Sequence, residues 1–272
     1  MSVAAQVFVI VVAGALGLVV GSFLNVVVYR VPAGVSLLRA SACPTCDVPI
    51  RWQQNVPVLS WVALRGRCAH CGSAISPRYP LVEAATALGF ALVASVAVVV
   101  PQAGDASWWL ALAAFLYLAA ITVALALIDV DVRRLPDGIV LPSYGVAIVL
   151  LALSTLVGHD LWPIVRATIG MAALYTFYLL LRLIRPDGMG GGDVKLAGLL
   201  GWYLAWLGWG PLVVGAFTGF LWGGIFGVAL LLSRRGSRAS RIPFGPWMLL
   251  GAWTGIVVGA QLTRMYLGVY TS

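Results

Sequence analysis

Eight apolar runs dominate this sequence, and most of them are long enough to cross a lipid bilayer. The hydrocarbon core of a bilayer is about 30 Å thick and is spanned by roughly 20 apolar residues in a helix. Only 10% of the 272 residues are charged, against about 25% in soluble domains. We therefore predict an all-α, polytopic integral membrane protein of about eight transmembrane helices. The runs are residues 6–28, 81–100, 108–128, 138–157, 162–183, 196–209, 211–231 and 244–263.

The sixth run is the shortest, and it meets the seventh at Gly208-Trp209-Gly210-Pro211, so this pair could instead form a re-entrant hairpin. Basic residues gather in four of the loops, the last of which holds Arg234, Arg235, Arg238 and Arg241. The positive-inside rule places these four loops in the cytoplasm and both termini outside. A charge of +8 that is spread over loops, and not along one face, argues against a nucleic-acid partner.

The segment 31–80 is the only sizeable soluble part that we predict, and it contains every cysteine of the chain. The spacing of two C-x-x-C pairs is typical of a structural zinc ribbon, in which four thiolates surround the ion. The alternative, two disulfides or redox-active dithiols, is disfavoured in a reducing cytoplasm. His70 lies between two ligands and could replace one of them. The predicted ligands are Cys43, Cys46, Cys68 and Cys71.

Two aspartates adjoin apolar runs and are candidates for catalysis. Asp129 ends the run 108–128, and Asp193 follows three glycines just before the run 196–209. An acid where a membrane segment meets water is costly to hold there and is a functional candidate by default. Two carboxyl groups that share a site hold one proton between them, so one can activate water while the other polarises a carbonyl. Both acids are expected on the inner side, where they could meet.

Other interpretations of the acids stay open. Either one could be a solvated loop carboxylate, and Asp131, Asp137 and Asp187 lie nearby. Asp129 is preferred to Asp131 only because it adjoins the apolar run. A transporter would use such buried acids to carry protons or cations, and a noncatalytic assembly scaffold built on the zinc loop is a third possibility.

The glycines before Asp193 are expected to let backbone approach closely and to adopt positive φ values, which would suit an extended peptide lying against the site. A merely flexible turn between helices would also use glycine. Glu83, at the start of the second run, is the only glutamate of the chain. It could belong to a methylating or substrate-reading region, or it could pair with a neighbouring arginine.

With these residues in view, the chain resembles the bacterial prepilin peptidases, the G-x-G-D aspartic proteases that process type IV prepilins and type II secretion pseudopilins. The resemblance covers nearly the whole chain in the order of the family. Besides the two C-x-x-C pairs, the matching stretches are residues 21–30, 78–83, 128–137, 189–196 and 243–246.

The resemblance implies a bacterial inner-membrane enzyme that removes a short leader after a glycine, at the cytoplasmic face. It makes Asp129 and Asp193 the catalytic pair, and it gives positioning roles toward the substrate or the loop to Gly190, Gly192, Lys195 and Glu83. Members with the cysteine loop are typically also N-methyltransferases that use S-adenosylmethionine. The expected partners are prepilins, pseudopilins and the lipid bilayer.

The apolar runs and the cysteine segment divide the chain into three expected domains. They are a first transmembrane helix at 1–30, the zinc loop at 31–80, and a membrane-embedded peptidase domain at 81–272.

Overall fold

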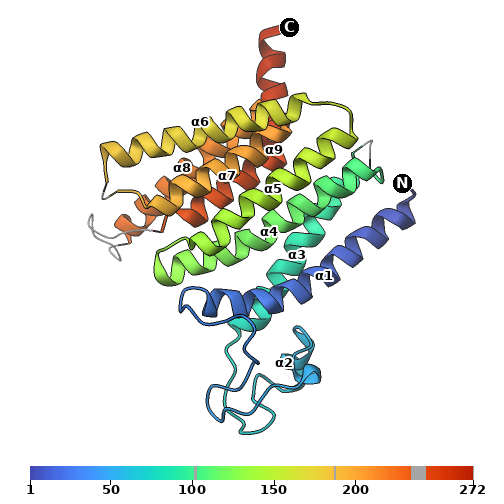
Figure 1. The fold of residues 1–272 in the computed structure, drawn as a ribbon, viewed down its shortest axis with the longest axis vertical. Helices are drawn as coiled ribbons and strands as arrows, with labels where there is room; N and C mark the ends of the chain where they lie inside the picture. The colour runs from blue at the N-terminus through green and yellow to red at the C-terminus, as the bar shows by residue number, and fades with distance from the viewer. Residues whose placement is uncertain (101–102, 187, 234–242, 272) are drawn as a thin grey trace. The chain divides into compact units, whose positions relative to one another are not determined.

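The computed structural model describes residues 1–100, 103–186, 188–233 and 243–271 (Figure 1). Within these ranges the chain is helical, and two isolated β-bridges, Ala42 with Pro49 and Arg67 with Ala74, take the place of strands. The all-α prediction is confirmed. Asp187 and the basic residues Arg234, Arg235, Arg238 and Arg241 lie outside the described ranges. The helices are α1 (Val3–Arg30), η1 (Trp52–Gln54), α2 (Leu59–Ala63), α3 (Arg78–Ala97), α4 (Ala106–Val132), α5 (Asp137–Val157), α6 (Trp162–Ile184), α7 (Gly191–Leu207), α8 (Trp209–Leu232) and α9 (Gly245–Thr271).

Each predicted apolar run lies mostly within one helix, but not every such helix is long and apolar enough to span a bilayer. Of the described residues, those of α1, α3, α4, α5, α6 and α8 form six candidate spans. Helix α7 has 17 residues, which at about 1.5 Å per residue reach only about 26 Å. The predicted number of eight spans is therefore not confirmed, and six is the number that the described part of the chain supports.

The chain divides into two compact units, Met1–Ala124 and Leu125–Ser272. In the first unit α1 and α3 lie side by side, with the cysteine loop beyond their ends (Figure 1). Small residues permit this packing, because a Cβ on Gly17 would lie 2.7 Å from the Cα of Ala87, and one on Gly21 would lie 2.7 Å from the Cα of Glu83. Glycine at a helix crossing lets two backbones approach closely.

Arg30, the last residue of α1, binds the backbone of the loop that follows the helix. Arg30 is buried, and its guanidinium donates hydrogen bonds to the carbonyl oxygens of Ser36, Leu37, Arg39 and Ala40. A buried guanidinium needs such acceptors for its several N–H groups. The arginine that ends α1 therefore anchors the loop to the helix.

The second unit is built around α7, which contacts α5, α6, α8 and α9 (Figure 1). Eleven of the 17 residues of α7 are buried. Close packing against α6 depends on Gly170 and Gly201, because a Cβ on either would overlap the facing helix. At the other end of α7, the guanidinium of Arg166 donates to the carbonyl oxygens of Ala205 and Trp206. These bonds satisfy carbonyls that have no partner within the helix.

Helices α8 and α9 also meet through glycines. A Cβ on Gly251 would overlap the backbone of Gly219, and one on Gly255 would lie 2.7 Å from the Cα of Gly215. The four residues are spaced at intervals of four along their helices, a pattern that brings membrane helices into direct backbone contact. This packing fixes the start of α9, where the candidate site lies.

Candidate active site and metal centre

Asp129 lies in the last turn of α4 and is only 5% exposed. Its Oδ2 accepts a hydrogen bond of 3.0 Å from the backbone N–H of Gly245, the first residue of α9. The N–H groups at a helix start have no partner within the helix, and the positive end of the helix dipole favours an anion there. A Cβ at position 245 would lie 2.8 Å from that same oxygen. Only glycine lets α9 begin so close to the carboxyl group.

Asp193 is held in the same manner at the start of α7. Its Oδ2 accepts a hydrogen bond of 3.0 Å from the backbone N–H of Gly190, the residue that precedes the helix. Each of the two predicted acids therefore accepts a backbone N–H from the beginning of a helix. The acids come from separate elements, but both are held by donors that the fold itself provides.

The expectation of positive φ values in the glycine run is wrong. Gly190 has φ −73° and ψ 153°, and neither Gly191 nor Gly192 has a positive φ. The glycines serve close packing instead. A Cβ on Gly191 would lie 2.7 Å from Nη1 of Arg182, and one on Gly192 would lie 2.8 Å from the Cβ of Leu135. Side chains of this chain therefore occupy the space that glycine leaves open.

Leu135 connects the surroundings of the two acids. Its side chain is buried and lies against Gly192, which is next to Asp193. It also lies against Gly245, since a Cβ added there would be 3.3 Å from Cδ2 of Leu135. The carboxyl groups of Asp129 and Asp193 also interact electrostatically. The structure thus brings together the two aspartates that the sequence singled out.

The rival acids lie elsewhere. Asp131 is exposed, and Asp137, the first residue of α5, forms an ion pair with Lys195. Asp187 lies outside the described residues. Burial therefore distinguishes Asp129 from Asp131 more clearly than its place beside the apolar run did.

Tyr178 lies at the candidate site and was not selected from the sequence. It lies on α6, is 3% exposed and interacts electrostatically with Asp193. Its ring lies 5.4 Å from that of Phe220 and 6.3 Å from that of Phe244. Phe244 immediately precedes Gly245, so the aromatic cluster of Tyr178, Phe220 and Phe244 lies beside both acids. An ionisable side chain inside an apolar run was the only signal that could have pointed to it.

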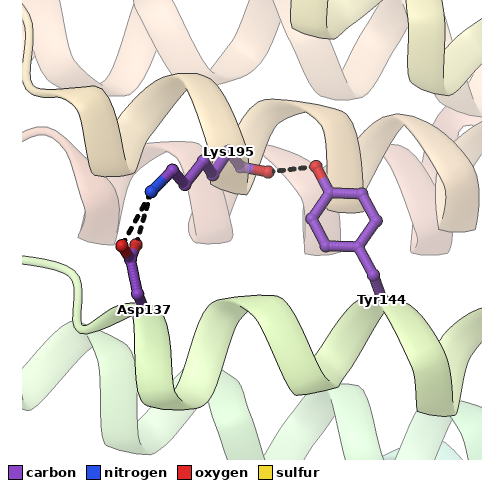
Figure 2. Close-up of polar contacts among 3 residues, drawn as sticks. All are labelled: Asp137, Tyr144 and Lys195. Carbon is purple, nitrogen blue, oxygen red and sulfur yellow. Dashed lines mark hydrogen bonds and ion pairs between the residues drawn. The ribbon is translucent and has the colours of Figure 1, made fainter.

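The side chain of Lys195 points toward Asp137 on α5 (Figure 2). Its Nζ lies 2.7 Å from Oδ1 and 2.8 Å from Oδ2 of Asp137. The hydroxyl of Tyr144, also on α5, donates a hydrogen bond of 2.5 Å to the carbonyl oxygen of Lys195. Both contacts join the first turns of α7 to α5.

Glu83 lies in the first unit, on the first turns of α3, and is 7% exposed. Its Oε2 accepts a hydrogen bond of 2.7 Å from the backbone N–H of Val58. Val58 has φ +60°, a conformation that a β-branched residue rarely adopts. The carboxylate therefore ties an unusual turn of the cysteine loop, just before α2, to a helix of the first unit.

The four cysteines form a cluster that could hold a metal ion. Their sulfur atoms all lie within 4.8 Å of one another, and no cysteine of the cluster is in a disulfide. The Sγ atoms of Cys43 and Cys71 are 3.8 Å apart. Four thiolates at about 2.3 Å from a tetrahedral zinc ion would be about 3.8 Å from one another. His70 is not in the cluster, although its backbone N–H donates to the Sγ of Cys68 at 3.5 Å.

Two matching turns present these sulfur atoms. In the first, the N–H of Cys43 donates to Val48 and the N–H of Asp47 donates to Cys43; in the second, Cys68 donates to Ser73 and Gly72 to Cys68. Asp47 and Gly72 occupy equivalent positions, and their φ angles are +54° and +71°. Each C-x-x-C pair is therefore carried by the same kind of tight turn, which fits a shared ion between them.

The thiols of the cluster differ in their readiness to ionise. Hydrogen bonds from the backbone of Thr45 and Cys46, with one from the Ser73 hydroxyl, lower the pKa of Cys43 to about 5. The backbone N–H of Val48 favours the thiolate of Cys46 as well, but burial and the neighbouring sulfur atoms raise the pKa of Cys46 to about 12. Adjacent thiolates repel one another, and a bound cation removes this conflict. The donor set thus fits a divalent metal ion.

Comparison with known proteins extends these observations. Residues 15–97 match the model of the bacterial peptidase A24 N-terminal domain, and residues 116–228 match the model of the type IV leader peptidase family. No solved structure gives a match.

Three curated relatives illustrate the likeness, each named prepilin leader peptidase/N-methyltransferase. The relative from Stutzerimonas stutzeri is 35% identical, over 93% of this chain and 91% of its own. The one from Pseudomonas aeruginosa is 36% identical over 93% and 91%, and the one from Neisseria gonorrhoeae is 35% identical over 90% and 89%. The chain therefore belongs to the type IV leader peptidase family.

Proposed function

We propose that this protein removes the leader peptides of type IV prepilins and pseudopilins with Asp129 and Asp193 as its catalytic acids, and that it N-methylates the new amino terminus. The proposal is supported by the position of Leu135, which lies against both Gly192, next to Asp193, and Gly245, the donor to Asp129. Each acid also accepts the N–H of a residue at a helix start. The names of the relatives supply the two reactions. A transporter finds no support in the family match.

The chemistry follows from a proton shared by the pair. Two neighbouring carboxyl groups do not both ionise readily, so one is a carboxylate while the other keeps its proton. The carboxylate takes a proton from water as the water oxygen bonds to the scissile carbonyl carbon, and the protonated acid gives its proton to the carbonyl oxygen. The C–N bond then breaks as the protonated acid gives its proton to the departing amine. The other acid takes a hydroxyl proton from the tetrahedral intermediate, so the pair again holds one proton.

The backbone donors at Gly245 and Gly190 have a defined part in this scheme. Each bonds one oxygen of its aspartate, so the second oxygen of each carboxyl group is the one that faces the reaction. Donors that are already in place cost no reorganisation at the moment of reaction. Tyr178 and its aromatic neighbours would then form the apolar wall on which the residues next to the scissile bond lie.

In the second reaction, S-adenosylmethionine would supply a methyl group to the freed amino terminus. Glu83 does not fit as a ligand of this cofactor, because it is buried and already accepts the Val58 N–H. Its part in the proposal is to hold the cysteine loop. The zinc ion, bound by Cys43, Cys46, Cys68 and Cys71, would be structural, since four thiolates leave no open position for substrate. The division into residues 1–30, 31–80 and 81–272 remains a prediction.

The membrane orientation is the last part of the proposal. Six long apolar helices and the family indicate a multi-pass inner-membrane protein. The basic loops favour a cytoplasmic position for the acid pair. The apolar helix of the prepilin would remain in the bilayer while its leader reaches this face from the cytoplasm.

The test is an assay of the purified protein in liposomes with a prepilin-like substrate, read by mass spectrometry with and without S-adenosylmethionine. We expect a product cut after the leader glycine, with one added methyl group when the cofactor is present. An uncut substrate would overturn the peptidase assignment, and a cut but unmethylated product would overturn the second activity.

A further inference from the structure

The connection between α4 and α5 joins the two acid-bearing elements. Helix α4 ends at Val132, three residues after Asp129. The next residue, Arg133, has φ +54° and donates its N–H to the carbonyl oxygen of Asp129. The chain then passes through Leu135 and begins α5 at Asp137. The whole connection is short, so the position of Asp129 at the end of α4 is coupled to the position of Asp137.

Leu135 acts as a spacer in this connection. The Cβ of Leu135 would lie 2.8 Å from a Cβ added at Gly192, and its Cδ2 would lie 3.3 Å from a Cβ added at Gly245. One glycine precedes Asp193 and the other donates to Asp129. A spacer of this kind sets how close the two elements come, but it does not hold them together.

Two polar contacts supply the attachment (Figure 2). The ammonium group of Lys195 bonds both oxygens of Asp137, and the hydroxyl of Tyr144 bonds the carbonyl oxygen of Lys195. Gly198 makes room for that hydroxyl. Lys195 is two residues from Asp193 and is the only lysine of the chain. Both ends of Lys195 are therefore engaged by α5.

Stability alone does not account for this ion pair. The side chains of Lys195 and Asp137 are 34% and 58% exposed, and such pairs contribute only about 0–1 kcal/mol. A bidentate ion pair nevertheless fixes the relative orientation of its two side chains. Small displacements of a reacting group lower the rate of the catalysed reaction greatly. The value of the pair thus lies in orientation.

We propose that Asp137 and Lys195 are positioning residues, which hold the first turn of α7 so that the carboxyl group of Asp193 meets Asp129 across Leu135. Lys195 then neither reads the substrate nor transfers a proton. This inference rests on the proposed peptidase function, because the pair acts through Asp193. It differs from the expectation that Lys195 positions the substrate.

The experiment is a double-mutant cycle with Lys195→Met, Asp137→Asn and the combined variant, read as kcat and KM for leader removal. We expect each single variant to lower kcat about 10- to 100-fold with KM unchanged, and the double variant to be no slower than either, because both changes break one contact. Lys195→Arg should retain most of the rate. Arg264→Met, which removes an exposed cation from α9, is the matched control.

Two kinetic outcomes would overturn the proposal. A raised KM in Lys195→Met alone, with Asp137→Asn at the wild-type rate, would show that Lys195 contacts the substrate. Additive losses in the double variant would show that the two residues act independently.

A second measurement does not depend on activity. Backbone hydrogen exchange of residues 189–196 should accelerate in both single variants while that of α8 stays unchanged, and equal exchange in all proteins would also overturn the proposal. If the wild type cuts no prepilin, the peptidase assignment fails, and the exchange rates alone still decide whether the pair holds this turn.

Discussion

The carboxyl group of Asp129 and the backbone N–H of Gly245 are 116 residues apart in the sequence and form a buried hydrogen bond of 3.0 Å. The bond requires that position 245 carry no side chain, since a Cβ would lie 2.8 Å from the acceptor oxygen. The start of α9 is thus shaped around one acid of the pair. The same holds for the start of α7, where Gly190 donates to Asp193.

Gly245→Ala is expected to abolish this arrangement. The new methyl group must displace either the carboxyl group of Asp129 or the start of α9, and overpacking of this kind costs about 1–3 kcal/mol. We expect leader removal to fall at least about 100-fold, measured on membranes with equal amounts of protein. Gly224→Ala on α8 is the control, because nothing lies within 4 Å of its added Cβ. Wild-type cleavage by Gly245→Ala would contradict the close approach.

Gly192→Ala tests the spacer role of Leu135. The added Cβ would lie 2.8 Å from the Cβ of Leu135, so we expect a strong loss of cleavage. Removing the opposing Cβ in the double variant Gly192→Ala/Leu135→Gly should restore part of the rate, because the atom nearest the added methyl group is then gone. Leu135→Gly alone serves as the reference. A double variant slower than both single variants would show that the glycine has another role.

Much of the helical architecture could be predicted from the sequence, because apolar runs report helices directly. The run 138–157 became α5, Asp137–Val157, and the run 162–183 became α6, Trp162–Ile184. The number of spans was harder to predict, since α7 is apolar yet has only 17 residues and is enclosed by its own neighbours. Hydropathy does not distinguish burial in lipid from burial in protein.

The sequence singled out the acids and the cysteines as candidates, but their contacts could not be predicted from it. Asp129 and Asp193 adjoin apolar runs, which is a local signal. The ion pair between Lys195 and Asp137 joins residues 58 positions apart, and no local pattern reports such a contact. The glycines before Asp193 were recognised, but their reason is the crowding by Leu135 and Arg182, which only packing in three dimensions reveals.

Glu83→Ala is expected to release the turn at Val58. The variant removes the acceptor of the partly buried Val58 N–H, and the loss of such a hydrogen bond costs about 0.5–1.5 kcal/mol. We expect faster backbone exchange and proteolysis of residues 52–64, with methylation impaired more than cleavage. Glu83→Gln keeps an acceptor oxygen and should behave as wild type in the loop. A defect in Glu83→Gln as severe as that in Glu83→Ala would point to a need for the negative charge.

Removal of the metal should unfold the cysteine loop and leave the membrane helices intact. A strong chelator, or Cys43→Ser and Cys68→Ser, takes away the ion or one of its thiolates, and the free energy of binding in such a site is free energy of folding. We expect one zinc ion per wild-type chain by metal analysis, and rapid proteolysis of residues 31–80 after its loss. Full methylation by a zinc-free protein would contradict the structural role.

Asp47→Gly should stabilise the same loop. Asp47 has φ +54° where the equivalent turn has Gly72. A left-handed conformation costs most residues about 1–2 kcal/mol, aspartate less, and glycine least. We expect the midpoint of chelator-induced opening to shift to a higher chelator concentration in Asp47→Gly. Gly72→Ala introduces the same strain into the second turn and should shift the midpoint the other way. Equal midpoints in both variants would show that the φ angles do not matter.

The most direct measurement is leader removal by Asp129→Asn and Asp193→Asn, each compared with wild type in liposomes by mass spectrometry. An asparagine oxygen can still accept the N–H of Gly245 or Gly190, so both variants should keep the wild-type melting temperature. Neither can hold the shared proton, so we predict no cleavage by either. Normal cleavage by a folded Asp129→Asn or Asp193→Asn protein would remove that aspartate from the catalytic pair and contradict the account.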